Sequence, residues 1–542
     1  MRVIVAGEKT LHFEQPRRVV RSEGARDASR VWDEAERELS NGSWIAGYFT
    51  YERDVLVLGV YGEPHEISLP VIESGPATAP LHSPLVRRLS RERYAESFDR
   101  IARGIDDGDV YQVNLTIPFD FVVPDALALW AHYAARTGAR YQAYVEDGDR
   151  AILSWSPELF LGFSGDAIRT KPMKGTAALD RVDELTNEKN LAEHVMIVDL
   201  LRNDLHRISG DVRLESFCER EAYPTFVTMT STIAARIESD SRLAGIFEAT
   251  FPCGSVTGAP KRAAMRFIRE CEPDSRGAYC GTIGFLSPER RGWWNVSIRT
   301  AQVDLTTRLG RYDAGGGIVA DSDAGDEWNE IQIKRLFLET DAELLETFAS
   351  NAEEETVRAH LCRLEKSAEA LGVTLDLAAA RRAVEQRCDD GPRRLVRLRV
   401  NPAGKVDAHH EPLESPRSPV RVCVSDLRVH SADPLLRHKT SWRPVHDAAA
   451  RAAKERGHFE ALLRNERDEL TEGARTTLFV RVDDELRTPP LSAGVLPGIL
   501  RARMLASGRA VERTVSTGDL RRAGAIYVGN SARGLLRATI VR

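Results

Sequence analysis

A second series of strand-like and helical segments begins about two thirds of the way along the chain, after the first series has ended. This division constrains the fold more than any other feature of the sequence. The segment DEWNEIQIKRLFLE predicts a closing helix, after which ELLETF begins a new strand-like stretch followed by a new helical pattern. A chain of 542 residues is also too long for a single hydrophobic core. We therefore expect two domains, residues 1–338 and 339–542, joined without a Pro-rich or Gly-rich linker.

The composition excludes several classes of function. A net charge of −6 gives no basic footprint for nucleic acid. No run approaches the roughly 18 apolar residues of a membrane span, and the N-terminus lacks a basic-then-apolar leader. The seven cysteines are scattered without a CxxC pair. We expect a soluble, cytoplasmic protein with reduced cysteines and with no nucleic-acid or membrane partner.

Helical and strand-like segments are mixed along the first domain. RVIVAG, SWIAGYFTYE and VLVLGVYG predict strands, and ARDASRVWDEAERELSNG predicts a helix that ends at Asn-Gly. The helical stretch SRERYAESFDRIARGIDDGD gives way to a strand at YQVNLTIPF, and mixed patterns continue to about residue 338. The fold class is therefore predicted as α+β.

Three glycine-rich segments of this domain suit a ligand. FPCGSVTGAPKRAAM is a small-residue loop that enters a helix, and the backbone N–H groups of a helix start suit an anion. A tight loop before a helix is the competing interpretation. AYCGTIGF and DAGGGIVADS are predicted as two further turns in which a side chain would block approach to the backbone.

Acidic residues and one lysine stand in patterns that suit chemistry. Glu193 lies on an apolar helix, and Glu327 and Glu330 are one helical turn apart, where like charges repel unless a cation lies between them. Carboxylate oxygens suit Mg²⁺, although a solvated acidic face is the alternative for each glutamate alone. Lys174 precedes a Gly-Thr turn in KPMKGT, a segment predicted as strand, turn and loop. A surface lysine is the ordinary interpretation, whereas a lysine at such a rim could be partly desolvated.

Eight motifs resemble, in their order, those of chorismate-utilising enzymes. This family includes the anthranilate synthase large subunit, isochorismate and salicylate synthases, and aminodeoxychorismate synthase component I. The motifs lie between about residues 90 and 338 and are YQVNL, SPELF, KPMKGT, EHVMIVDLLRNDL, FPCGSVTGAPK, CGTIGF, SIRT and AGGGIVADS. The resemblance implies a two-sheet α/β sandwich, completed by the N-terminal strands, and chorismate as the substrate.

The resemblance also implies residue roles. Glu193, Glu327 and Glu330 would surround Mg²⁺, and Glu158 of SPELF would be the general acid that protonates the departing 4-hydroxyl. Arginine has a fork of donors that suits a carboxylate, as implied for Arg299. The implied substrate-binding residues are Thr176, Gly258, Tyr279, Arg299, Gly315, Gly316, Gly317 and Lys334.

The family divides at Lys174, where anthranilate synthases have alanine and aminodeoxychorismate synthases have lysine. In the latter the amine would attack the ring at C2 and expel the 4-hydroxyl, and ammonia would then enter at C4 and displace the lysine. Only about one lysine in 2,500 is a free amine at pH 7, so this role requires desolvation. Thr228 stands where many relatives have a histidine, and Gln112 where water-activating relatives have a lysine. No Gly-x-Cys-x-Gly nucleophile turn occurs, so ammonia is expected from a separate glutaminase subunit or from solution.

From about residue 341 the chain resembles the class IV aminotransferases, a fold type that binds pyridoxal phosphate. The matching stretches are ELLETF, HLCRLEKSAEALG, LLRHKTSWRPVHDAA, LTEGARTTLFV, GVLPGILRARML and VGNSARG. Lys439 would bind the cofactor covalently, and Glu472 would face its pyridine nitrogen. The implied phosphate ligands are Arg363, Gly498, Ile499 and Ser531. A surface lysine and a Pro-Gly turn before a helix are the competing interpretations.

One position departs from the class IV pattern. Thr347 is retained, but Ala349 replaces the arginine that relatives use for a substrate carboxylate. Either another group such as Arg533 holds that carboxylate, or the domain is slow or inactive. On a chain that forms aminodeoxychorismate, the expected second activity is its lyase, which releases pyruvate and forms 4-aminobenzoate, a folate precursor. Two alternatives stay open: an anthranilate synthase-like chain with a transaminase domain, and a C-terminal domain that is only a scaffold.

Overall fold

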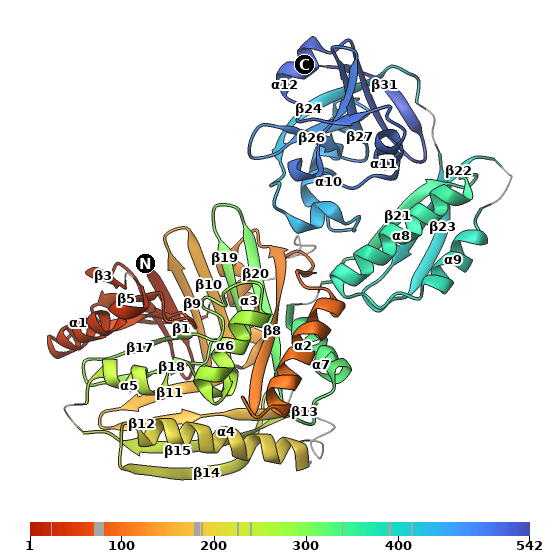
Figure 1. The fold of residues 1–542 in the computed structure, drawn as a ribbon. Coiled ribbons are helices and arrows are strands. Elements are labelled where there is room, and N and C mark those ends of the chain that lie inside the picture. Colours follow the sequence, from red (N-terminus) through yellow and green to blue (C-terminus); the bar gives the residue numbers. More distant parts are fainter. Residues whose placement is uncertain are drawn as a thin grey trace. The chain divides into compact units, whose positions relative to one another are not determined.

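The computed structural model describes residues 1–22, 24–69, 81–177, 185, 188–224, 227–238, 241–338, 340–388, 392–413 and 416–541. Contacts within the chain define two compact units, which are described separately (Figure 1). Unit 1 comprises Met1–Leu81, Leu89–Phe119 and Val123–Phe337, and unit 2 comprises His82–Arg88, Asp120–Val122 and Leu338–Arg542. The two short early segments of unit 2 were not expected from the sequence, and the division at residue 338 stays a prediction.

Unit 1 is built on two large sheets. The first sheet has the order β16-β8-β20-β19-β10-β9-β1-β2-β6. Its strands are β1 (Arg2–Ala6), β2 (Thr10–Phe13), β6 (His65–Ile67), β8 (Gln112–Val122), β9 (Tyr141–Asp147), β10 (Arg150–Ser156), β16 (Gly258–Ala259), β19 (Thr300–Asp304) and β20 (Leu309–Ile318).

The second sheet has the order β13-β15-β12-β11-β18-β17-β4-β5-β3, with β14 paired to β15. Its strands are β3 (Arg18–Arg21), β4 (Trp44–Phe49), β5 (Leu56–Tyr61), β11 (Leu159–Ser164), β12 (Ala167–Lys171), β13 (Met173–Ala177), β14 (Asp211–Ala222), β15 (Val227–Arg236), β17 (Thr282–Leu286) and β18 (Arg291–Asn295).

The two sheets of unit 1 share one apolar core. Val5 and Phe13 of the first sheet are buried in one cluster with Val57 and Ile283 of the second. This burial confirms the predicted two-sheet sandwich. The helices of unit 1 are α1 (Ala28–Ser40), α2 (Arg91–Asp106), α3 (Ala126–Thr137), α4 (Glu188–His206), α5 (Leu243–Thr250), α6 (Lys261–Cys271) and α7 (Ala324–Arg335), with short 3-10 turns η1 (Ala25–Asp27) and η3 (Gly254–Val256).

Helix α4 lies along the end of the second sheet, against β13, β14 and β15 (Figure 1). This packing brings Glu193 of α4 over Lys174 of β13. The prediction of a turn at DAGGGIVADS is wrong for its glycines, because Gly315, Gly316 and Gly317 lie within β20. A Cβ atom on Gly315 would clash with the carbonyl oxygen of Leu115 in β8, so close approach of two strands accounts for that glycine.

Unit 2 contains a small sheet and a larger one. The small sheet has the order β21-β22-β23, and α8 and α9 pack against it to bury Phe348, Leu361 and Leu364 (Figure 1). The larger sheet has the order β26-β25-β24-β31-β30-β27-β28-β29. Among the described residues of the whole chain, no helix is long and apolar enough to cross a membrane.

The strands of unit 2 are β7 (Val86–Arg87), β21 (Leu344–Ala349), β22 (Arg394–Val400), β23 (Val406–Pro412), β24 (Val420–Arg428), β25 (Glu460–Arg464), β26 (Leu470–Gly473), β27 (Thr477–Val482), β28 (Glu485–Thr488), β29 (Val511–Glu512), β30 (Ala525–Asn530) and β31 (Gly534–Ile540). Its helices are α8 (Glu354–Leu371), α9 (Leu377–Glu385), α10 (Pro444–Glu455), α11 (Ile499–Ala506) and α12 (Thr517–Arg522), with the 3-10 turns η5 (Pro434–Arg437) and η6 (Leu491–Ala493). The 3-10 turn η4 (Leu336–Leu338) spans the division between the two units along the chain.

Candidate active sites

Lys174 lies on a strand whose register is broken by a bulge. The pairing of β13 with β15 shifts between Lys174 and Thr176, and Gly175 has a φ of 69°, the left-handed conformation that favours glycine. The buried Thr228 hydroxyl lies 2.6 Å from the Gly175 carbonyl oxygen and donates to it. Thr228 therefore holds the bulge that presents Lys174. The side chain of Thr176 is outside the described residues.

The amine of Lys174 faces other residues of unit 1. Its Nζ atom lies 3.5 Å from Glu193 Oε2, and each of the two side chains is only 17% exposed. The same Nζ lies 3.5 Å from the position that a Cβ atom on Gly317 would occupy. Strand β20, which contains Gly315, Gly316 and Gly317, is called the glycine strand below. Since β13 and β20 belong to different sheets, Lys174 of the second sheet reaches across to the glycine strand of the first.

Glu158, between β10 and β11, is a buried carboxyl near this lysine. Its side chain accepts a hydrogen bond at 2.7 Å from Ser255, which lies in η3 of the motif FPCGSVTG. Burial raises the pKa of Glu158 to about 7, although the Ser255 hydrogen bond and the charge of Lys174 act in the opposite direction. At neutral pH this carboxyl can therefore hold a proton, as a general acid must.

Gln112, the first residue of β8, lies beside the same glycine strand. It is fully buried, and a Cβ atom on Gly317 would clash with its amide nitrogen. Among the described residues, neither amide atom of Gln112 has a hydrogen-bond partner. Buried polar groups are nearly always hydrogen-bonded, so an orphaned amide at this place fits a polar ligand.

The three glutamates predicted to bind Mg²⁺ are not equivalent. Glu327 is buried, accepts a hydrogen bond from Ser322 at 2.7 Å, and has Oε2 2.8 Å from the Cβ position of Gly316. Glu193 forms an ion pair with Lys174, and the amine of Lys174 lies beside Gly317 of the glycine strand. Glu330 is 53% exposed and forms an ion pair with Lys334 at 2.6 Å.

Within the described part of the chain, no three His, Cys, Asp or Glu side chains lie close enough to hold one metal ion. The carboxylate donors are of the kind that Mg²⁺ prefers, but by themselves they do not complete a ligand set for the ion. Lys334 also donates to the Gly315 carbonyl oxygen at 2.7 Å, which attaches α7 to β20.

The remaining predicted chorismate contacts lie in the interior of unit 1. Arg299 has a positive φ of 48°, its guanidinium carbon lies 5.7 Å from the centre of the Phe337 ring, and burial lowers its pKa. Tyr279 is buried, and burial raises its pKa. Tyr312 lies within electrostatic range of both side chains. Gly258 pairs with Val113 in β8.

In unit 2, Lys439 lies beside β21, because the backbone N–H of Leu345 donates to its carbonyl oxygen at 2.8 Å. Burial is the main cause that lowers the pKa of Lys439 to about 7; the cations Arg363, Arg443 and Arg397 act in the same direction and Glu346 acts in the opposite one. An amine with a pKa near 7 is deprotonated in a substantial fraction of molecules at neutral pH, which fits a lysine that bonds to a carbonyl carbon.

Two other predicted cofactor ligands, Arg363 and Ser531, form hydrogen bonds with Glu346 and His360 respectively. Arg363 donates to Glu346 from Nε at 2.8 Å and from Nη2 at 2.6 Å, and to the Pro497 carbonyl oxygen from Nη1 at 3.1 Å. These bonds use three of the five donors of a guanidinium, so donors remain for a phosphate. The Ser531 hydroxyl lies 2.8 Å from Nε2 of His360. Glu346 and His360 were missed by the sequence reasoning.

Helix α11 begins next to Arg363, and the backbone N–H groups of its first turn are of the kind that suits an anion. Ile499 is its first residue, and Gly498 precedes it as the N-cap. A Cβ atom on Gly498 would lie 3.0 Å from the Thr477 hydroxyl, so the backbone there is closely approached. Glu472 is 7% exposed, with Oε1 3.6 Å from His446. A buried carboxylate, a partly buried lysine with a lowered pKa and an N-terminal helix turn together fit pyridoxal phosphate.

Ala349, which stands where class IV relatives have an arginine, lies in β21 of the small sheet. Ala349 is buried and pairs with Leu395, whereas Thr347 pairs with Arg397 of β22. Arg397 forms an ion pair with Glu411 at 2.8 Å. Arg397 is thus the arginine that the structure sets opposite Thr347, a position that the sequence reasoning did not consider.

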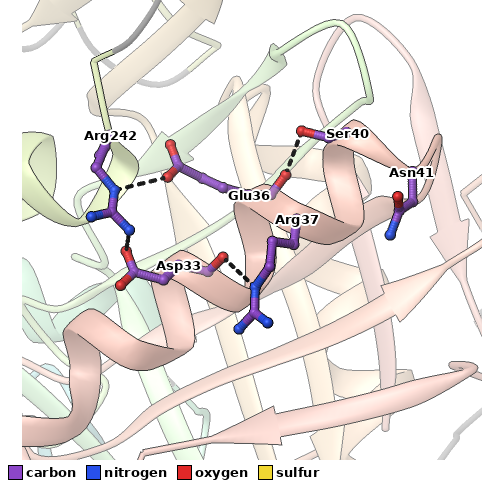
Figure 2. A pocket seen from close by; sticks show the side chains of 6 residues that line it. All are labelled: Asp33, Glu36, Arg37, Ser40, Asn41 and Arg242. Atoms are coloured by element: carbon purple, nitrogen blue, oxygen red, sulfur yellow. Dashed lines mark hydrogen bonds and ion pairs between the residues drawn. The ribbon is translucent and has the colours of Figure 1, made fainter.

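A surface groove lies along α1 (Figure 2). It is lined by Asp33, Glu36, Arg37, Ser40, Asn41 and Arg242. Arg242 pairs with Asp33 at 2.6 Å and with Glu36 at 3.7 Å. The lining charges therefore largely neutralise one another, and the groove carries none of the predicted site residues.

Comparisons with known proteins agree with this architecture. Residues 62–339, more than half of the chain, match the chorismate binding enzyme family, and residues 343–541 match class IV of the amino-transferases. The chain belongs to the chorismate binding enzyme family and carries a class IV aminotransferase domain after it.

Individual relatives cover only part of the chain. It is 37% identical over 268 residues to aminodeoxychorismate synthase component 1 of Klebsiella aerogenes, a match of 47% of this chain and 58% of that protein. It is 34% identical over 264 residues to anthranilate synthase component 1 of Archaeoglobus fulgidus, covering 47% and 63%. The chain thus spans little more than half the length of these relatives.

One solved structure supports the fold of the first unit. Anthranilate synthase component I from Streptococcus pneumoniae superposes with a TM-score of 0.52 at 24% identity, and the match covers 62% of this chain and 92% of that one. At this identity the likeness concerns the fold alone.

Proposed function

We propose that the chain is a bifunctional enzyme of 4-aminobenzoate synthesis. The first unit would convert chorismate and ammonia to 4-amino-4-deoxychorismate, and the second would release pyruvate from this product. The single observation that carries the proposal is the position of Lys174, whose amine is mostly buried between Glu193 and the glycine strand. The name of the Klebsiella aerogenes relative, aminodeoxychorismate synthase component 1, supports the same assignment.

In the proposed first reaction, the neutral amine of Lys174 attacks ring carbon C2 as the C4–oxygen bond breaks. Glu158 gives its proton to the departing hydroxyl, so the leaving group is water. Burial of Glu158 supports this role because it keeps the carboxyl protonated up to about pH 7. Ammonia then bonds to C4 as Lys174 leaves C2 as a neutral amine. The new ammonium group at C4 gives a proton to the carboxylate of Glu158, which restores the carboxylic acid.

Two further participants belong to the proposal. Glu193, Glu327 and Glu330 are proposed to bind Mg²⁺ together with a substrate carboxylate, since Mg²⁺ commonly takes only some of its ligands from the protein. A separate glutaminase subunit is proposed to supply ammonia. Arg299 and Tyr279 are proposed to hold the other carboxylate of chorismate, with Thr176 and the backbone of Gly258 nearby.

The second unit is proposed to act with pyridoxal phosphate, which supplies an electron sink when bound. Arg363, Ser531 and the start of α11 would hold its phosphate, and Glu472 would hold a proton at its pyridine nitrogen. Lys439 would bond to the cofactor and then carry the proton taken from the substrate ring, a role that its lowered pKa supports. Thr347 and Arg397 are proposed to hold a substrate carboxylate in place of the arginine missing at Ala349.

The test supplies the purified chain with chorismate, ammonia, Mg²⁺ and pyridoxal phosphate, and identifies the aromatic product by chromatography against standards. Chromatography is required because 4-aminobenzoate and anthranilate are isomers of equal mass. We expect 4-aminobenzoate, and we expect Lys174→Ala to abolish it while an added aminodeoxychorismate synthase restores it through the intact second unit. Anthranilate as the product would support the alternative, and undiminished turnover by Lys174→Ala would refute the covalent role.

EDTA provides a separate test of the metal. Chelation should stop consumption of chorismate but leave the conversion of pre-formed aminodeoxychorismate unchanged. Metal-independent consumption of chorismate would contradict the Mg²⁺ assignment. Glutamine in place of ammonia should support turnover only when a glutaminase is added.

A further inference from the structure

A buried hydrogen-bonded chain links two of the proposed phosphate ligands. Glu346 Oε2 lies 2.6 Å from Nδ1 of His360, whose Nε2 lies 2.8 Å from the Ser531 hydroxyl oxygen. The Glu346 and His360 side chains are 1% and 2% exposed. Arg363 binds the same carboxylate with two of its nitrogens. The order of contacts is therefore Arg363, Glu346, His360 and Ser531.

The charges fix the direction of these hydrogen bonds. Arg363 and His360 hold the pKa of Glu346 well below its usual range against the effect of burial, so Glu346 is an ionised acceptor. His360 must therefore donate from Nδ1. Burial lowers the pKa of His360, with Arg363 and Lys439 acting in the same direction and Glu346 against them. A neutral His360 that donates from Nδ1 has a bare Nε2, so Ser531 donates its proton to Nε2.

This arrangement is unsuited to an anion. A hydroxyl has one proton, and a phosphate dianion offers only acceptors. While Ser531 donates to His360, it presents lone pairs to the phosphate. A proton added at Nε2 reverses the bond, because Nε2–H then donates to the hydroxyl oxygen and the hydroxyl proton becomes available to the phosphate. The imidazolium also adds a positive charge beside Arg363, whose own charge is balanced by Glu346.

We infer that His360, oriented by Glu346, is a positioning residue that sets whether Ser531 donates to the phosphate, so that binding of a phosphorylated pyridine takes up a proton at His360. The inference rests on the proposed pyridoxal phosphate site, and it deepens that site by assigning a role to two residues for which none was expected. The proton comes from solvent and forms the Nε2–H bond, and nothing is oxidised or reduced.

Calorimetric titration with pyridoxine 5′-phosphate tests the inference. This ligand has the ring and the phosphate but no aldehyde, so it cannot bond to Lys439. Titrations of the full chain at pH 7.5, in buffers of different ionisation enthalpy, give the number of protons taken up per ligand bound. We expect the wild-type chain to take up about 0.5 to 1 proton more than His360→Gln. Proton changes at Lys439 and at the phosphate are common to both chains and cancel in this difference.

Three variants make the result specific. Ser531→Ala removes the hydroxyl and should lose the same extra uptake, and this residue is only partly buried, so the variant tests the relay even where His360→Gln perturbs folding. His410→Gln is the matched control, because His410 bonds instead to the carbonyl oxygen of Arg387 at 2.8 Å, and it should keep the wild-type uptake. Thermal unfolding shows which variants are folded.

The outcomes separate the inference from the proposed function. Binding of pyridoxine phosphate without extra uptake by the wild-type chain overturns the inference alone. Extra uptake that survives Ser531→Ala also overturns it, since His360 would then respond to charge without the hydroxyl. Failure of every chain to bind the ligand overturns the proposed cofactor site and the inference with it.

Discussion

The buried carboxyl of Glu158 gives the sharpest quantitative prediction. Its ordinary pKa of 4.5 rises to about 7 in the folded chain, mainly because burial disfavours the charged form. One pKa unit corresponds to about 1.4 kcal/mol, so ionised Glu158 costs the folded state about 3 kcal/mol. Glu158→Gln keeps the size and a hydrogen-bonding group but cannot ionise.

The sign of the effect follows from proton binding. Between about pH 4.5 and pH 7 the folded chain keeps the Glu158 proton while the unfolded chain has lost it, so the free energy of unfolding falls as the pH rises. The stabilising contribution of protonated Glu158 is complete below the unfolded-state pKa and is lost by about pH 7 to 8. Relative to Glu158→Gln, the wild-type chain should therefore lose about 3 kcal/mol between pH 4.5 and pH 8.

Urea unfolding followed by tryptophan fluorescence measures this difference. Seven of the eight tryptophans belong to unit 1, and Trp442 is the exception, so the signal reports the unit that contains Glu158. All other titrating groups cancel when the two chains are compared at the same pH. Glu96→Gln, at a glutamate that is 63% exposed, should show a difference that does not change with pH.

The same variant also tests chemistry. Loss of a general acid typically slows the reaction by about 100-fold to 10,000-fold, and consumption of chorismate by Glu158→Gln should fall within that range. If the stability difference between Glu158→Gln and the wild-type chain stays constant within about 1 kcal/mol from pH 4.5 to pH 8, Glu158 ionises near its ordinary pKa. A stability difference that does not change with pH would therefore contradict the proposal that Glu158 carries the proton for the leaving hydroxyl.

Two further variants test the two lysines. Thr228→Val should leave the partly buried Gly175 carbonyl without this donor and destabilise unit 1 by about 0.5 to 1.5 kcal/mol in urea unfolding, with slower consumption of chorismate. Thr228→Ser should retain both the stability and the rate, and equal stability of Thr228→Val and the wild-type chain would contradict the role of Thr228 in holding the bulge. Lys439→Ala should abolish the visible absorbance band of bound pyridoxal phosphate. It should leave the ammonia-dependent consumption of chorismate by the first unit unchanged. A band that persists in this variant would exclude Lys439 as the residue that bonds to the cofactor.

Local patterns predicted the architecture because each pattern reports on its own segment. The ordered motifs identified the two-sheet sandwich and the class IV domain, and the helix over residues 91–106 and the strand at YQVNL are present as expected. The glycines of DAGGGIVADS predict a turn but lie within β20, because glycine occurs both in turns and where two strands approach closely. Only the pairing of β20 with β8 distinguishes the two explanations.

The parts of the sites that sequence did not predict depend on contacts between distant segments. Ser255 is 97 positions from Glu158, and Ser531 is 171 positions from His360. One signal was available for His360, which lies one helical turn before Arg363 and so shares its face of α8. Glu346 stands in a strand whose neighbours at alternate positions are apolar, and a buried charge at such a position requires a partner.

The two lysines proposed to form bonds to carbon lie in opposite electrostatic environments. Lys439 is partly buried near three arginines, which together with its burial outweigh Glu346 and lower its pKa. Lys174 instead faces the carboxylate of Glu193 at 3.5 Å. The proposed covalent roles thus place one amine among arginines and the other beside a carboxylate. The two sites therefore cannot make their lysines reactive by the same arrangement of neighbouring charges.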